Sequence, residues 1–312
     1  MLFGTTGRVK DHFYISGLST FPVHLLDGAT PALFEAGVTC AGKIYAEAIR
    51  SVLGIRQPRI LFLTHVHWDH CGAVSYLKEA FPSLRIAASR KAAEILRKQH
   101  AVELIERFNK SVKPEVAALP GVAPTQLVDD VFRPFGIDVE LKDGQVIEGD
   151  EGFSVEVLAT PGHTKDHLSY YIPQERLLIA SEASGCLNSV GNIISCFLVD
   201  YDAYLSSLKR LAGLPVEILC QGHRVVFVGE NAIRAFFTRS ISESIKFKDR
   251  VYELLETEDG SIDRVVRRIK AEQYDINPGI KSPEGPYVLN LTAQVTHLAE
   301  KRSGGMETAV RK

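Results

Sequence analysis

The feature that most constrains this sequence is a run of six residues, 65–70 (HVHWDH), in which four side chains belong to types that bind metal ions. An apolar run at residues 60–63 comes directly before it and has the length and composition of a buried strand. The histidines therefore stand on a loop that leaves a buried strand, and such loops commonly carry active sites. Further ligands must come to this loop from other parts of the chain.

The residue types in this run indicate a site for two metal ions. Alternate positions on an extended loop point to one side, which lets His65 and His67 hold one ion. Asp69 and His70 follow and can turn toward a second ion. Two ions about 3.5–4 Å apart share a hydroxide and polarise a carbonyl or phosphoryl oxygen, and a hydrolase needs both functions. We expect two divalent ions, zinc or iron with manganese also allowed, since these ligands suit all three metals.

The elements around this loop are expected to be short. Strands that end at turns are expected at residues 13–15, 23–26 and 32–34, as a β-meander. Helical patterns follow at residues 43–53, 71–80 and 91–110. Prolines then interrupt any long element, so residues 111–134 are interpreted as an irregular insertion. Strand patterns return at residues 139–141, 145–147, 155–158, 170–172 and 177–180.

Two later histidines stand beside glycine at the ends of expected strands. His163 lies in the turn at residues 160–164 (TPGHT), and His223 follows Gly222 after a strand expected at residues 216–219. Their contexts, PGH and QGH, match each other. We expect both to supply ligands that the early loop lacks. The alternative interpretation is that each is a turn residue without a metal.

The character of the sequence changes after residue 230. Helical patterns separated by glycine and proline follow at residues 231–257, 262–273 and 286–302, and residues 303–312 are expected to be a frayed tail. We interpret residues 1–230 as a catalytic domain that contains the insertion, and residues 231–312 as a helical C-terminal subdomain.

Composition narrows the classes of partner. The 36 basic and 38 acidic residues leave a net charge of −2, which does not favour nucleic acid or an anionic membrane. The five cysteines are odd in number and scattered, which favours a reducing compartment, and no apolar run approaches the roughly 20 residues that span a bilayer. We expect a cytoplasmic protein with a small-molecule substrate and no nucleic-acid or membrane partner, and we leave a homodimer open.

With the run HVHWDH, the turn PGHT and the late pair GH in this order, residues 10–230 resemble the metallo-β-lactamase superfamily. The resemblance implies an α/β fold, the αβ/βα four-layer sandwich. It also implies that His65, His67 and His163 hold the first metal, and that Asp69, His70 and His223 hold the second. Asp69 is in addition our candidate catalytic residue.

One position departs from that family's pattern. After the strand at residues 177–180 the superfamily usually has Gly-Asp, with the aspartate bridging both ions, whereas this chain has Ser181 and Glu182. Glu182 is our candidate for the bridging ligand. Its extra methylene moves the carboxylate outward, so the alternatives are a bridge with a displaced loop, one ion alone, or no metal.

A closer likeness is to the quinolone-response protein PqsE and other thioesterase-like members, through residues 70–77 and 202–208 and the helical C-terminal part. Glyoxalase II enzymes of the same superfamily also append C-terminal helices that hold the thiol portion of a thioester. This resemblance implies that the helical subdomain covers the site and sets substrate choice.

Our functional hypothesis is a dinuclear metallohydrolase whose bridging hydroxide attacks an ester-like carbonyl, a thioester or a lactone, while the metals stabilise the developing oxyanion. Two alternatives stay open. One is a regulatory or binding protein, like PqsE, with incidental hydrolysis. The other is a phosphodiesterase for a small nucleotide.

Several other residues near the motifs are given structural interpretations. Trp68 and Cys71 flank the ligands, and we expect Cys71 to pack inward, while Trp68 is equally suited to packing or to lining a pocket. His167 is a candidate for orienting a ligand or the substrate. The remaining histidines are expected to have structural or surface roles: His12, His24, His100 and His297.

Overall fold

The computed structural model describes residues 1–129, 131–149, 153–276 and 283–310, with side chains to residue 303. Contacts divide the chain into two compact units. The first contains residues 1–159, 166–181 and 215–233, and the second contains residues 160–165, 182–214 and 234–312. The expected division into a domain at residues 1–230 and a subdomain at residues 231–312 stays a prediction.

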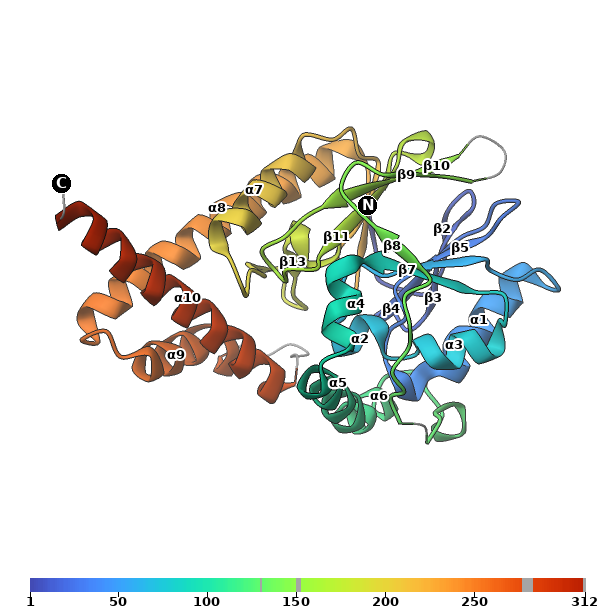
Figure 1. Ribbon diagram of the computed structural model, residues 1–312, viewed down its shortest axis with the longest axis horizontal. Helices are drawn as coiled ribbons and strands as arrows, with labels where there is room; N and C mark the ends of the chain where they lie inside the picture. The colour runs from blue at the N-terminus through green and yellow to red at the C-terminus, as the bar shows by residue number, and fades with distance from the viewer. Residues whose placement is uncertain (130, 150–152, 277–282, 311–312) are drawn as a thin grey trace. The chain divides into compact units, whose positions relative to one another are not determined.

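The first unit is built on two seven-stranded sheets (Figure 1). One has the order β1 (Leu2–Phe3), β16 (Val226–Val228), β15 (Ile218–Cys220), β12 (Leu177–Ile179), β11 (Leu168–Ile172), β10 (Ser154–Ala159) and β9 (Val146–Glu148). The other has the order β2 (Gly7–Lys10), β3 (Phe13–Gly17), β4 (Pro22–Leu26), β5 (Ala32–Phe34), β6 (Ile60–Phe62), β7 (Arg85–Ser89) and β8 (Val139–Leu141). In this second sheet the strands from β5 to β8 are parallel.

The inner faces of the two sheets form one hydrophobic core. Phe34 and Phe62 on neighbouring strands stack with ring centroids 5.2 Å apart, and Tyr170 from the other sheet lies 5.1 Å from Phe62. All three are fully buried. The Tyr170 hydroxyl donates a 2.6 Å hydrogen bond to the carbonyl of Leu63, so the sheets are also joined by a polar contact close to the loop at residues 65–70.

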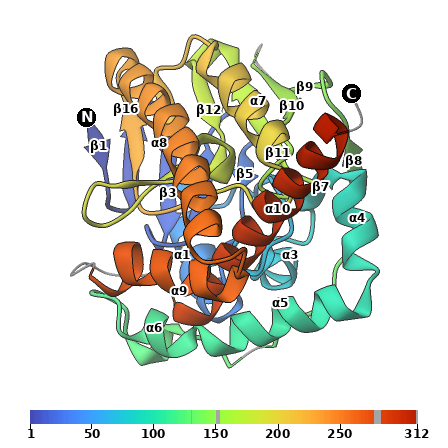
Figure 2. The same cartoon turned by 90° about the vertical axis from the view of Figure 1, so that its left-hand side faces the viewer.

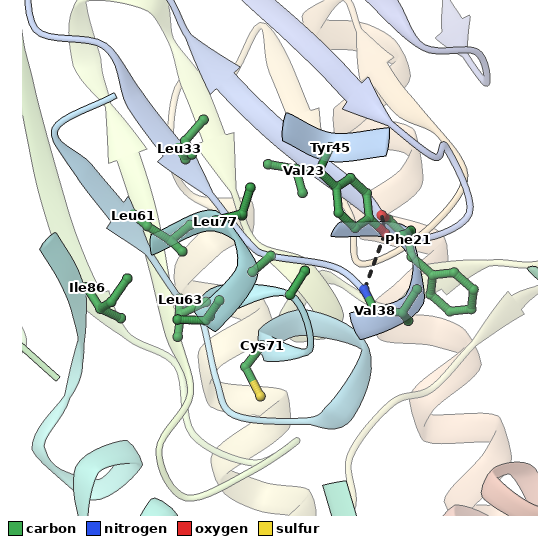
Figure 3. Close-up of a cluster of buried hydrophobic side chains, with 14 of the residues drawn as sticks. Phe21, Val23, Leu33, Val38, Tyr45, Leu61, Leu63, Cys71, Leu77 and Ile86 are labelled. Carbon is green, nitrogen blue, oxygen red and sulfur yellow. Dashed lines mark hydrogen bonds between the residues drawn. The ribbon is translucent and has the colours of Figure 1, made fainter. Parts of the chain in front are cut away.

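The outer face of the second sheet is covered by helices. They are α1 (Gly42–Leu53), α2 (Trp68–Cys71), α3 (Val74–Ala80), α4 (Arg90–Leu96), α5 (Gln99–Ser111) and α6 (Lys113–Ala117). Figure 3 shows Leu77 of α3 in the same hydrophobic cluster as the strand residues Leu61 and Ile86. Tyr45 of α1 is buried there, where its hydroxyl donates to the Phe21 carbonyl at 2.9 Å and accepts from the Val38 N–H at 3.3 Å.

The second unit is mostly helical. It holds the hairpin β13 (Cys186–Leu187) and β14 (Ile193–Ile194), and the helices α7 (Tyr201–Ala212), α8 (Glu230–Thr257, from Arg234 onward), α9 (Ile262–Lys270) and α10 (Glu284–Val310). A π-helical turn at residues 271–275 follows α9. Helix α9 lies alongside α10 (Figure 2). Arg302 of α10 donates to the carbonyl of Tyr252 at 2.8 Å, which joins α10 to α8.

Most expected elements are confirmed, and several differ from the prediction. The expected helix at residues 91–110 is two helices, α4 and α5, and the insertion at 111–134 contains α6 and a 3-10 turn at Pro124–Gln126. Strand β7 was not expected, because its sequence RIAAS is poor in β-branched residues. The expectation of a frayed tail from residue 303 is wrong as far as Val310, because the backbone of residues 303–310 continues helix α10. Among the helices of the described residues, none has the length and apolar character needed to cross a membrane.

Candidate metal centre

The loop after β6 is held in an extended form before the chain turns into α2. The carbonyl of Thr64 accepts from the Leu168 N–H at 2.8 Å, and the N–H of Val66 donates to Asp166 Oδ2 at 3.0 Å. His67 has φ −73° and ψ 155°, and α2 begins at the next residue. Anchoring Val66 in this way fixes the backbone between the two histidines, so their side chains are presented from a rigid loop.

The structure brings five sequence-predicted ligands of the first unit together. Ring centroids lie 4.5 Å apart for His65 and His67, 4.3 Å for His65 and His70, and 5.2 Å for His70 and His223. Asp69, His70 and His223 offer ligand atoms within 4.8 Å of one another. Asp69 Oδ1 lies 3.9 Å from His70 Nε2, and its Oδ2 lies 3.5 Å from His223 Nε2. The group of Asp69, His70 and His223 therefore fits a cation with mixed imidazole and carboxylate ligands.

Three of these histidines have an oxygen acceptor opposite Nδ1. The acceptor is Thr64 Oγ1 at 2.9 Å for His65, Glu35 Oε1 at 3.2 Å for His70, and the Thr20 carbonyl at 3.0 Å for His223. An acceptor at Nδ1 places the proton on that nitrogen and leaves the lone pair on Nε2, which is how metal-binding histidines are usually oriented. The donor set of the first unit therefore fits divalent metal ions.

Glu35 is a residue of this centre that the sequence did not reveal to us. Its side chain is buried, and its Oε1 accepts from Thr64 Oγ1 at 2.5 Å as well as facing His70. Because the Thr64 hydroxyl donates to Glu35, the Thr64 oxygen accepts from His65. One carboxylate thus orients two histidines. Its φ of +65° lies in the left-handed region, a strained conformation that is frequent at functional sites. The available signal was an acid inside the apolar stretch 32–38 (ALFEAGV).

The predicted orienting role of His167 has a geometric basis. Its ring stacks on His65 with centroids 4.9 Å apart and an interplanar angle of 26°, and both rings are buried. The neighbouring Asp166, which anchors the loop at residues 65–70 through Val66, was not singled out from the sequence. Its signal was the position between two chemistry-bearing stretches, three residues after His163.

His163 and Glu182 belong to the second unit, and their roles as ligands stay predictions. His163 Nδ1 faces the carbonyl of Cys196 at 2.5 Å, which leaves the lone pair on Nε2 as in the histidines of the first unit. Glu182 is buried in a 3-10 turn, Ser181–Ser184. Its carbonyl accepts from the Gly185 N–H at 3.0 Å, so the backbone there forms a closed turn.

Three neighbours of the site make packing contacts, which was the expectation for Cys71 and His24 and one of the two interpretations of Trp68. Cys71 is fully buried in the core, and burial raises the pKa of its thiol well above the ordinary value, which favours the neutral thiol. The ring of Trp68 packs edge-on against Phe21 at 5.8 Å. Burial, followed by the charge of His70, lowers the pKa of His24 to about 3, so this imidazole is neutral at pH 7.

The family model of the Metallo-beta-lactamase superfamily matches residues 23–223. This chain belongs to the metallo-beta-lactamase superfamily. The match runs from β4 to His223 and contains every predicted ligand, so the family expected from the sequence is confirmed.

The curated relatives include proteins named as hydrolases. A "Beta-lactamase-like protein 2 homolog" of Caenorhabditis elegans is 25% identical over 70% of this chain and 59% of its own length. A "Hydroxyacylglutathione hydrolase" of Mesorhizobium japonicum is 30% identical over 51% of this chain and 45% of its own. An "Atrochrysone carboxyl ACP thioesterase" of Aspergillus fumigatus is 24% identical over 80% of this chain and 61% of its own length. The chain thus spans less than two thirds of each of these relatives.

Solved structures confirm the fold class of a metallo-β-lactamase protein with a C-terminal helical region. A metallo-beta-lactamase family protein from Thermus thermophilus matches with a TM-score of 0.60, at 21% identity, over 91% of this chain and 89% of its own. An archaeal superfamily protein from Sulfolobus tokodaii matches with a TM-score of 0.57, at 16% identity, over 93% and 98%.

Proposed function

We propose that this chain is a dinuclear metal-dependent hydrolase that acts on an ester-like carbonyl, with a thioester as the substrate class. The observation that carries the proposal is the common orientation of His65, His70 and His223, each with an oxygen acceptor at Nδ1. Histidines that serve only packing have no need of a shared tautomer. Fixing Nε2 as the lone-pair nitrogen in all three suits metal binding.

The proposed ligand sets take the family pattern as their basis, and the geometry of the first-unit residues supports them. We assign His65, His67 and His163 to one ion, Asp69, His70 and His223 to the other, and Glu182 to the position between them. Zinc, iron and manganese all suit these ligands. When bound, such a pair of ions supplies an activated water and a Lewis acid for the carbonyl oxygen.

The residues of the chain have separate tasks in this mechanism. Glu35, through its contacts with Thr64 and His70, keeps the ligand rings from turning. Asp69 Oδ2 is 3.5 Å from His223 Nε2, so the two side chains can hold the same cation. We assign Asp69 the further task of accepting a proton from the attacking water. The side chain of Asp69 is 13% exposed, and little solvent competes for its oxygens.

Two relatives favour a thioester over other carbonyl esters. One is named a hydroxyacylglutathione hydrolase and another an ACP thioesterase. A lactone is the alternative carbonyl substrate, and a phosphodiester is the alternative class of reaction. We propose a small-molecule substrate that does not require nucleic acid or a membrane, in agreement with the near-balanced charge of the chain.

The test compares His65→Ala and His67→Ala with His100→Ala, an exposed histidine on α5. Metal content is measured by elemental analysis, and hydrolysis is measured on acyl-glutathione and acyl-pantetheine thioesters, lactones and bis-p-nitrophenyl phosphate. We expect the first two variants to lose metal and at least about 100-fold of thioester hydrolysis, since even an orienting partner is worth roughly 10–100-fold. Full activity in either variant would refute the mechanism. Faster turnover of the phosphodiester than of any carbonyl ester would replace the substrate class.

A further inference from the structure

Within the second unit, His163 rests on the segment that joins β14 to α7. Its Nδ1 faces the carbonyl of Cys196 at 2.5 Å. The carbonyl of Gly162, one residue earlier, accepts from the N–H groups of Leu198 at 3.0 Å and Val199 at 3.1 Å. The orientation of the His163 ring therefore depends on the backbone of residues 195–200.

The peptide unit between Ser195 and Cys196 is fixed at both ends. The Ser195 carbonyl accepts from Gln294 Nε2 of α10 at 2.8 Å, and the Cys196 N–H donates to the Tyr204 hydroxyl at 3.3 Å. Because a peptide unit is planar, these two bonds fix its orientation. The next carbonyl along the chain is the one that faces His163. Only the φ and ψ angles of Cys196 separate that carbonyl from the peptide unit held by Gln294.

A second side chain of α10 holds the far end of the same segment. His297 lies three residues after Gln294 on the helix, and its Nε2 accepts from the N–H of Tyr201 at 3.0 Å. The ring of Phe197 is fully buried and lies edge-on to His297 at 6.1 Å and to Tyr201 at 5.2 Å. Helix α10 thus contacts the segment at residue 195 and again at residue 201.

Burial makes the contact of Gln294 specific. Gln294 is 7% exposed and Ser195 is 6% exposed. A buried amide or carbonyl without a partner costs about 1–3 kcal/mol, so the pair strongly favours this arrangement over sliding of the helix. The two residues are 99 positions apart in the sequence. The contact therefore couples the C-terminal helix to the turn that carries His163.

We infer that Gln294 and His297 are positioning residues for His163, and that helix α10 tunes the metal affinity of the His163 site through the segment 195–201. This inference rests on the proposed function, in which His163 is a ligand. It gives the C-terminal helices a task in assembling the metal centre, in addition to any contact with substrate.

The main variant is Gln294→Met, which keeps the side-chain length and removes the N–H donor. Asn290→Ala, an exposed position one turn earlier on α10, is the matched control. Zn²⁺ affinity is measured on the full chain by competition with a chromophoric chelator. Hydrogen exchange of peptides covering residues 195–200 is followed in the metal-free protein. We expect one of the two Zn²⁺ ions to bind roughly 10–100-fold more weakly in Gln294→Met, the other to be unchanged, and exchange of the segment to rise.

His297 supplies an independent pair of variants. His297→Gln keeps an acceptor near the position of Nε2, whereas His297→Leu removes it. We expect His297→Leu to weaken the binding of the same Zn²⁺ ion that Gln294→Met affects. We expect His297→Gln to bind that ion nearly as tightly as the unmodified protein. If His297 had a purely structural role, both variants would have a lower melting temperature, and the affinities for the two Zn²⁺ ions would not change differently.

Two outcomes would overturn the inference, and they are distinguishable. If His163→Ala loses one Zn²⁺ ion while Gln294→Met and His297→Leu bind both ions as tightly as the unmodified protein, the positioning role is wrong and the proposed function stands. If His163→Ala keeps both ions at full affinity, the ligand role of His163 fails and takes the inference with it.

Discussion

Glu35 Oε1 and His70 Nδ1 lie 3.2 Å apart, and both side chains are buried. The same oxygen accepts from the hydroxyl of Thr64, which in turn accepts from His65. One carboxylate at the end of β5 thus sets the tautomers of two histidines that follow β6. The parallel pairing of β5 and β6 brings these residues together, because the same ends of parallel strands meet at one edge of the sheet.

Replacing Glu35 should therefore weaken metal binding without removing a metal ligand. We expect Glu35→Gln to lower Zn²⁺ affinity by roughly 10–100-fold, because a neutral amide oxygen is a weaker acceptor for Thr64 and His70 than the carboxylate oxygen. Chelator competition on the purified variant measures the change. Glu47→Gln on the exposed face of α1 serves as the control for loss of one negative charge. Equal affinities of the two variants would show that Glu35 does not orient the ligands.

The sequence carried enough information to single out the candidate ligands that cluster in the first unit, but not the groups that orient them. His65, His67, Asp69 and His70 stand within one short run, and their types alone indicate a metal. The orienting groups are far away in the sequence: Glu35 is 29 residues from Thr64, and Asp166 is 100 residues from Val66. Their roles depend on strand pairing and on the packing of the two sheets, which local patterns do not determine.

The helices after residue 230 illustrate the same limit. Their existence followed from apolar periodicity, which is a local property. The contact of Gln294 with Ser195 had no such signal, because glutamine is common on helices and 99 residues separate the pair. Sequence reasoning placed His297 in a structural or surface role, and its bond to the Tyr201 N–H is of the structural kind.

Gly162 should tolerate no side chain, because the turn that carries His163 is packed directly on α7. A Cβ at this position would lie 2.3 Å from the backbone nitrogen of Tyr204, and φ is +129°. We expect Gly162→Ala to lower the free energy of unfolding by about 3 kcal/mol or more, from the clash and the strained backbone together. Urea denaturation measures the change.

Gly191 isolates the backbone contribution to this effect. Its φ is +84°, and a Cβ there would meet nothing within 4 Å. Gly191→Ala should therefore cost only about 1 kcal/mol, the penalty for placing alanine in the left-handed region. Similar losses in the two variants would mean that the contact with Tyr204 adds nothing.

His24 should make the metal-free protein less stable as the pH falls. Burial lowers the pKa of His24 to about 3, whereas the unfolded chain has the ordinary value of 6.5. Between these values the unfolded state binds the proton and the folded state does not. Stability is therefore lost as the pH drops below about 6.5, by up to about 1.4 kcal/mol per pH unit, until the folded-state pKa is reached.

The contribution of His24 is obtained by difference. The free energy of unfolding is measured in the presence of a chelator at several pH values from 7 to 4.5, for the unmodified chain and for His24→Leu. We expect the stability of the unmodified chain, relative to that of His24→Leu, to decrease as the pH falls, because leucine cannot bind a proton. Parallel curves would show that His24 is protonated in the folded state as readily as in the unfolded chain.

Thiol chemistry tests the claim that Cys71 packs inward and does not bind metal. Burial raises the pKa of Cys71 and Cys220 well above the ordinary value and that of Cys40 to about 11, and all three side chains are buried. Cys186 and Cys196 are partly exposed. Because the thiolate is the reactive form, a disulfide reagent at pH 7.5 should titrate two thiols quickly in the native protein and all five after unfolding.

Removal of metal with a chelator should leave the reactivity of Cys71 unchanged. A third thiol that becomes reactive only when metal is removed, and that Cys71→Ala eliminates, would instead place Cys71 among the ligands.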